Sequence, residues 1–150
     1  MTRNESNCSA CEAALIEREI IDVLHTYCLA VDSCDEDVFL ALWADGATLD
    51  FGDRYTGAPV GFFTSVRANR AFIEAMSHYV TNIRMQVTDD KTSVKSTCGV
   101  SAIVVPKPET GRQPRVIRGT YHDHWVYERG RWAICHRRFE KTLEIALGHQ

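Results

Sequence analysis

The chain has 150 residues, of which 45% are hydrophobic and 25% are charged, and its formal net charge is −3. This length suits one domain whose core needs no disulfide or metal, and the composition excludes disorder over most of the chain. No apolar run approaches the roughly 18 residues of a membrane span, and charges of both signs are mixed along the chain. We therefore expect neither a membrane nor a nucleic-acid partner.

The N-terminus is polar and lacks the apolar segment of a secretion signal, which favours a cytoplasmic location with reduced cysteines. Cys8 and Cys11 form a C-x-x-C pair, but no second pair follows at the spacing of a zinc site. We expect a flexible leader over 1–12, a single domain over 13–140 and a tail over 141–150.

The first half of the chain has the apolar spacing of helices. A stripe that runs from Ile16 through Tyr27 to Val31 predicts one long amphipathic helix over 13–31. The segments that follow predict shorter elements: a helix over 35–43, a strand over 47–51, a glycine-rich loop over 52–61 and a helix over 65–77.

The second half alternates with the period of strands, and in its first strand His78, Val80 and Asn82 fall on one face. The expected strands cover 78–87, 93–105, 115–127 and 131–139, and hairpin-like turns join them. Helices followed by strands indicate the α+β class. We expect a strongly curved, antiparallel or mixed sheet wrapped around the long helix, with two further helices. This cone-shaped barrel would enclose a small-molecule cavity.

Three sets of residues resemble a known family. They are Ile21-x5-Tyr27-x3-Val31-Asp32, His78-Tyr-Val-Thr-Asn82, and Gly119-x-Tyr121-x-Asp123-x-Trp125 with Gly130-Arg-Trp132 and Arg137. Over about 13–139 the chain is similar to the SnoaL-like family of the nuclear-transport-factor-like cone fold. That family includes scytalone dehydratase, bile acid 7α-dehydratase, hexachlorocyclohexane dehydrochlorinase and polyketide cyclases.

The resemblance implies a catalytic dyad in which His78 is the base and Asp32 holds it. It also implies Arg137 as a further catalytic residue. Tyr27 stands where the dehydratases carry tyrosine and the dehydrochlorinase carries lysine.

The chemistry of the dyad residues agrees with these roles. A neutral imidazole titrates near pH 6.5 and can accept a proton, provided that a partner such as a carboxylate fixes its tautomer. Asp32 ends the first helix, where the macrodipole disfavours an anion, and a histidine that becomes cationic would offset that cost. In the alternative interpretation, Asp32 only caps the next helix and His78 is a satisfied boundary histidine.

Tyr27 and Arg137 are open to two interpretations each. Tyr27 would donate a hydrogen bond to a substrate oxygen, or it would only pack in the core. Arg137 would support developing negative charge in the cavity, or it would form a structural ion pair with Asp123 or Asp50.

We expect five further residues to bind the substrate: Asn82, Cys98, Val100, Tyr121 and Trp125. His122 and His124 share a strand face but have no evident third ligand, so we expect no metal site. The sequence has no phosphate-binding glycine loop or nucleotide motif, so we expect no cofactor.

The sequence therefore predicts a cofactor-independent lyase of the dehydratase or dehydrohalogenase type. Its substrate would be a small, largely apolar, cyclic or carbonyl-bearing molecule, and the protein would be a homodimer or homotrimer. One alternative is a polyketide cyclase or a ketosteroid-type isomerase. Another is a non-catalytic ligand-binding or assembly subunit, similar to the β subunit of ring-hydroxylating dioxygenases.

Overall fold

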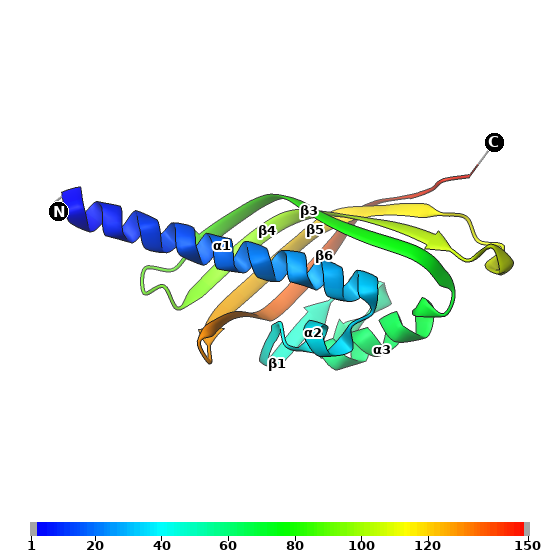
Figure 1. Cartoon of the computed structure of the whole chain (residues 1–150), viewed down its shortest axis with the longest axis horizontal. Coiled ribbons are helices and arrows are strands. Elements are labelled where there is room, and N and C mark those ends of the chain that lie inside the picture. The colour runs from blue at the N-terminus through cyan, green and yellow to red at the C-terminus, as the bar shows by residue number, and fades with distance from the viewer. Residues whose placement is uncertain (1–2, 149–150) are drawn as a thin grey trace.

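The computed structural model describes the backbone of residues 3–148 and the side chains of residues 10–148. Within these residues the helices lie on one side of a curved sheet (Figure 1). The elements are α1 (Arg3–Ser33), α2 (Glu36–Leu40), β1 (Trp43–Asp50), η1 (Gly52–Arg54), β2 (Thr56–Gly57), α3 (Pro59–Arg70), β3 (Ile73–Val87), β4 (Ser93–Pro106), η2 (Pro108–Thr110), β5 (Arg115–Glu128) and β6 (Arg131–Ala146).

The sheet has six strands in the order β2-β1-β6-β5-β4-β3. All neighbouring strands are antiparallel except β1 and β6, which run parallel. Long hairpins join β3 to β4, β4 to β5 and β5 to β6, as the turn signals indicate. The α+β class and the mixed, curved sheet predicted from the sequence are confirmed.

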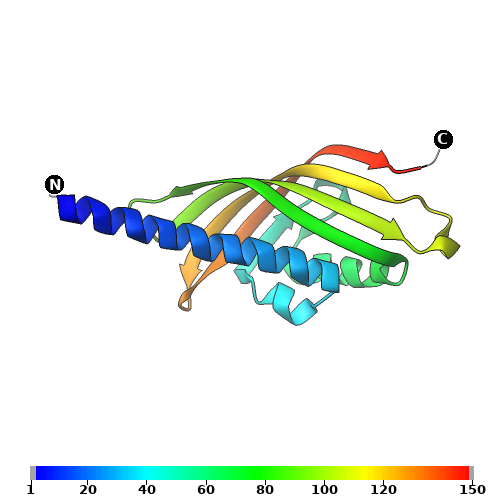
Figure 2. The ribbon, with the colours of Figure 1, turned by 45° about the horizontal axis from the view of Figure 1, so that its top comes forward.

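The apolar stripe of α1 packs against the sheet. Figure 2 shows α1 crossing in front of the strands, with its N-terminal end extending past them. The buried side chains of the stripe are Ile20, Leu24, Tyr27 and Val31. Burying each of these contributes about 1.5–3 kcal/mol, so the stripe anchors the helix to the sheet. No helix in the described part of the chain is both long and apolar enough to cross a membrane.

Several predicted boundaries are wrong. The helix α1 already begins at Arg3, and β6 continues to Ala146 because it pairs with β5 as far as Arg115. The expected leader over 1–12 and tail over 141–150 are thus helix and strand in large part. Residues 1, 2, 149 and 150 lie outside the described residues.

The third helix also begins and ends earlier than predicted. The helix α3 begins at Pro59, where the fixed φ of proline suits a first helical residue, and it ends at Arg70. The strand β3 then begins at Ile73, which pairs with Pro106. Long-range strand pairing therefore overrides the helical pattern of residues 73–77.

A bulge in β3 overturns the predicted face of Asn82. Its φ is +53°, and the register with β4 shifts between Thr81 and Arg84. Because an inserted residue reverses the alternation, His78 is partly buried whereas Asn82 is exposed. His78 and Asn82 therefore do not share a face.

Gly119 of β5 is a point of close contact with β6. A Cβ atom at this position would lie 2.3 Å from the Glu140 carbonyl oxygen and 2.4 Å from the Phe139 ring. We expect Gly119→Ala to lower the free energy of unfolding by about 1–3 kcal/mol in urea denaturation. The backbone of β5 or β6 must shift to make room for the added methyl group. Gly99→Ala is the control, since its nearest neighbour is the Thr81 hydroxyl at 3.1 Å. Equal losses in the two variants would contradict this assignment.

Candidate active site

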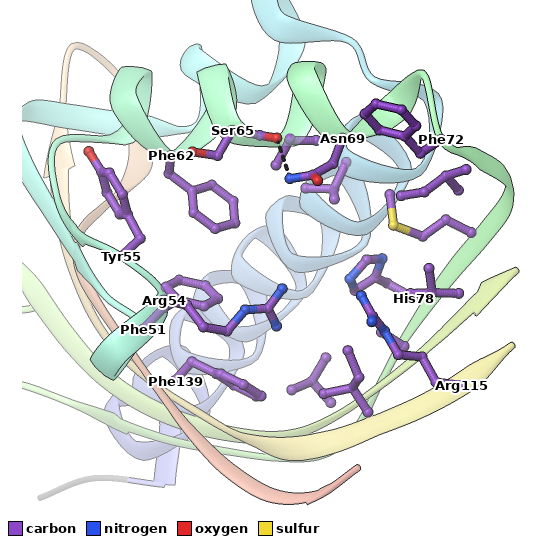
Figure 3. A pocket seen from close by; sticks show the side chains of 18 of the residues that line it. Phe51, Arg54, Tyr55, Phe62, Ser65, Asn69, Phe72, His78, Arg115 and Phe139 are labelled. Carbon is purple, nitrogen blue, oxygen red and sulfur yellow. Dashed lines mark hydrogen bonds between the residues drawn. The ribbon is translucent and has the colours of Figure 1, made fainter. Parts of the chain in front are cut away.

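A cavity of about 390 Å³ lies between the helices and the inner face of the sheet. Aromatic and aliphatic side chains form most of its wall, with Phe51 and Phe62 stacked at a ring distance of 4.7 Å. Figure 3 shows the side chains of His78, Arg54 and Arg115 among these walls. A volume of this size and a mostly apolar lining are typical of sites for small organic molecules.

His78 and Asp32 are in direct contact. Asp32 Oδ1 lies 2.6 Å from His78 Nδ1, and Asp32 Oδ2 accepts the backbone N–H of His78 at 2.8 Å. The His78 and Asp32 side chains are 13% and 18% exposed, and His78 lines the cavity. An ionised Asp32 can only accept, so Nδ1 carries the proton and Nε2 of the neutral ring is left as a proton acceptor.

Arg137 is completely buried and forms an ion pair with Asp123. Its Nε and one Nη each donate to a separate Asp123 oxygen at 2.7 Å. Burial alone would lower the pKa of Arg137, but the Asp123 carboxylate raises that pKa well above its usual value. The other nitrogen, Nη1, has no hydrogen bond within the described residues.

This ion pair corrects the position predicted for Arg137. Its guanidinium carbon lies 4.2 Å from the ring centre of Tyr27 and 4.1 Å from that of Tyr121. The two tyrosines line the cavity, but Arg137 does not. The ion pair with Asp123 that was one of the two interpretations is present, and Arg137 contacts the two rings from outside the cavity lining.

Tyr27 packs in the hydrophobic core and also lines the cavity. It is only 1% exposed and packs against Phe39 and Trp43, yet it also lines the cavity. Burial raises the pKa of Tyr27, and nearby Arg137 opposes this only in part. The hydroxyl therefore keeps its proton at neutral pH and can act as a hydrogen-bond donor.

Only two of the five expected substrate-binding residues line the cavity, Val100 and Tyr121. Asn82 lies past the bulge, and Cys98 and Trp125 lie outside the lining. Cys98 is in the core, where burial raises its pKa to about 12. Trp125 is also buried, and its indole N–H donates to Ser96 Oγ at 2.8 Å.

Three cationic residues of the cavity, Arg54, Arg112 and Arg115, were not among the site residues predicted from the sequence. Arg54 belongs to η1, Arg112 to the loop before β5, and Arg115 to the first position of β5. Arg115 alternates with Ile117 and Tyr121 on the inner face, so strand periodicity could have identified it. No periodic signal marks Arg54 and Arg112, because they lie outside regular strands and long helices.

The family model described as "SnoaL-like domain" matches residues 12–138. The chain belongs to the SnoaL-like family. No curated protein matches it significantly. The match covers Asp32, His78 and every residue that lines the cavity except Phe139.

Solved structures share the fold at low sequence identity. A candidate scytalone dehydratase from Novosphingobium aromaticivorans is 19% identical, with a TM-score of 0.80 over 93% of each chain. A hexachlorocyclohexane dehydrochlorinase, LinA type 2, is 18% identical, with a TM-score of 0.81 over 93% of each chain. A type 3 enzyme from Novosphingobium barchaimii is 18% identical, with a TM-score of 0.80 over 92% of this chain and 94% of that chain. These similarities establish the cone fold, and the reaction remains a separate question.

The buried ion pair gives a stability prediction. Asp123→Asn leaves the charge of Arg137 buried without a counter-ion, so we expect a loss of about 3–5 kcal/mol in urea denaturation. The double variant Arg137→Met/Asp123→Leu should lose less, because no charge stays buried. Asp45→Asn is the control, since the Asp45–Arg129 ion pair is exposed. A double variant that is less stable than Asp123→Asn would contradict the prediction.

Proposed function

We propose that this protein is a cofactor-independent lyase in which His78 and Asp32 remove a proton from a small cyclic or carbonyl-bearing substrate. The observation that carries the proposal is the 2.6 Å contact between His78 Nδ1 and Asp32 Oδ1 at the wall of a mainly apolar cavity. A general base needs a free nitrogen at the substrate and a partner that stabilises its cationic form, and this arrangement supplies both.

The proposed elimination uses few groups. His78 Nε2 takes a proton from a carbon, the electrons of the C–H bond form a double bond to the neighbouring carbon, and the leaving group departs from that carbon with the electron pair of the bond that breaks. Asp32 stabilises the imidazolium that forms. Tyr27 is the donor to the oxygen of a carbonyl or leaving group, because its raised pKa keeps the phenol protonated.

Arg137 has a positioning role in this proposal. Its guanidinium lies behind the rings of Tyr27 and Tyr121, and its charge is matched by Asp123. It would therefore act on the reaction through the placement and the pKa of Tyr27. Of the other residues first expected to bind substrate, Val100 and Tyr121 are kept as wall residues.

The same cavity could also serve a polyketide cyclase or a ketosteroid-type isomerase, since both begin with proton abstraction. A non-catalytic ligand-binding subunit is the alternative outside enzymes. The partly buried imidazole–carboxylate pair favours an enzyme. A cavity that only binds a ligand could be formed by apolar packing and would not need a proton acceptor in its wall. A cytoplasmic location and a homodimer or homotrimer remain part of the proposal.

Proton abstraction can be detected before the natural substrate is known. Cyclic ketones and halogenated or hydroxylated ring compounds would be incubated with the protein in deuterated water. Mass spectrometry would then record deuterium uptake at carbon, or loss of water or hydrogen halide. A binding subunit would produce neither change, whereas an isomerase or a lyase would produce at least one.

Substitution of the base tests the assignment on any substrate found. We expect His78→Gln to lower the rate about 10²–10⁴-fold, and Asp32→Asn to lower it strongly as well. The two losses should not add, because the residues act as one unit. His25→Gln is the matched control, since His25 is exposed on α1. Turnover by His78→Gln within a few-fold of the wild type would rule out His78 as the base.

A further inference from the structure

Apart from His78, which can be neutral or cationic, the charged residues that line the cavity are all arginines. They are Arg54, Arg112 and Arg115, and no carboxylate is among the lining residues in the described part of the chain. The whole chain carries a net charge of −3, so this local excess of positive charge is opposite in sign to the protein. A cleft lined by one sign of charge concentrates ligands of the other sign.

These arginines have few partners of their own. Within residues 10–148, no hydrogen bond or ion pair involves the guanidinium group of Arg54 or Arg112. Arg115 Nε lies 3.6 Å from Glu144 Oε1, and this buried nitrogen makes no hydrogen bond. Glu144 also pairs with Lys141, so a single carboxylate is shared between two neighbouring cations.

The lowered pKa of Glu144 is the result expected where positive charges outnumber carboxylates. A hydrogen bond from Lys141, with further contributions from Lys141, Arg115 and Arg54, lowers the pKa of Glu144. Glu144 therefore stays ionised and balances only part of the charge. One carboxylate thus stands against three cations, and the guanidinium groups of Arg54 and Arg115 face the cavity (Figure 3).

The arginines and the base lie at different depths. Arg54 and Arg112 are exposed and the Arg115 side chain is 40% exposed, whereas the His78 side chain is 13% exposed. The arginines thus line the part of the cavity open to solvent, and we call them the arginine rim. Phe51, Phe62 and Phe139 are lining residues too, and they give the cavity an apolar wall.

We propose that the substrate carries a carboxylate, which Arg54 and Arg115 bind at the arginine rim while its apolar ring faces His78. This inference rests on the proposed function in one respect only, that the cavity is the substrate site. A guanidinium group presents its N–H donors in a fork that matches the two oxygens of a carboxylate. Binding at the rim would fix which carbon of the ring faces the base.

A matched pair of probes tests this inference without any turnover. Naphthalene-2-carboxylate and naphthalene-2-carboxamide have nearly the same shape and differ in charge. Calorimetric titration of the full chain should show the carboxylate binding about tenfold or more tightly than the amide, because its hydrogen bonds are charge-assisted. The preference should shrink as salt is raised, since the rim is exposed to solvent.

Arginine variants then test which residues cause the preference for the carboxylate over the amide. Arg54→Gln/Arg115→Gln should bring the two probes to within about twofold of each other, with little change for the amide. Arg118→Gln is the control, because it removes the same charge from the same strand at an exposed position outside the cavity lining. It should keep the preference. Circular dichroism and a urea titration would show that each variant is folded.

The outcomes separate this inference from the proposed function. Equal binding of both probes to the wild type, or an unchanged preference in Arg54→Gln/Arg115→Gln, would overturn the carboxylate site and leave proton abstraction untouched. Naphthyl phosphate that binds much more tightly than the carboxylate would overturn the choice of carboxylate in favour of a phosphate. Conversely, a retained preference with no deuterium exchange would reject the lyase and leave the anion site standing.

Discussion

The carboxylate of Asp32 joins two of the elements that line the cavity, the C-terminal end of α1 and the first half of β3. It accepts two hydrogen bonds from one residue, the ring Nδ1 and the backbone N–H of His78. Since β3 is an edge strand, that backbone N–H would otherwise lack a protein partner. A carboxylate near the C-terminal end of a helix is opposed by the helix dipole, and the two donors offset that cost.

The same contact sets the chemistry of His78. A ring that donates from Nδ1 has its other nitrogen free, and its backbone is held by the same carboxylate, so the ring has little freedom to turn. Arg137 gives the cavity-lining Tyr27 and Tyr121 a comparable rigidity, because its pair with Asp123 is buried and its guanidinium packs against both rings. The Asp32–His78 pair thus joins elements that are distant in the sequence, whereas the Asp123–Arg137 pair links opposite residues of the neighbouring strands β5 and β6.

The sequence predicted the long helix and the four long strands because each has a sustained period that burial enforces. It also placed Asp32 and His78 together, through residues that resemble the family. It failed at Asn82, since a single inserted residue in β3 reverses the faces and leaves no mark in composition. It failed at residues 73–77 because pairing with β4 decides their conformation, and no local pattern records a distant strand.

Two residues of the arginine rim, Arg54 and Arg112, were missed for a related reason. Arg54 and Arg112 lie on η1 and on the loop before β5, so their position depends on how the whole sheet curves. His78 and Asp32 instead lie on β3 and α1, which the core fixes in place. Loops accept substitutions more readily than buried elements do. Charge at the rim can therefore change while the imidazole and its carboxylate keep their geometry, so the proposed proton abstraction and the proposed recognition of a carboxylate can vary independently of each other.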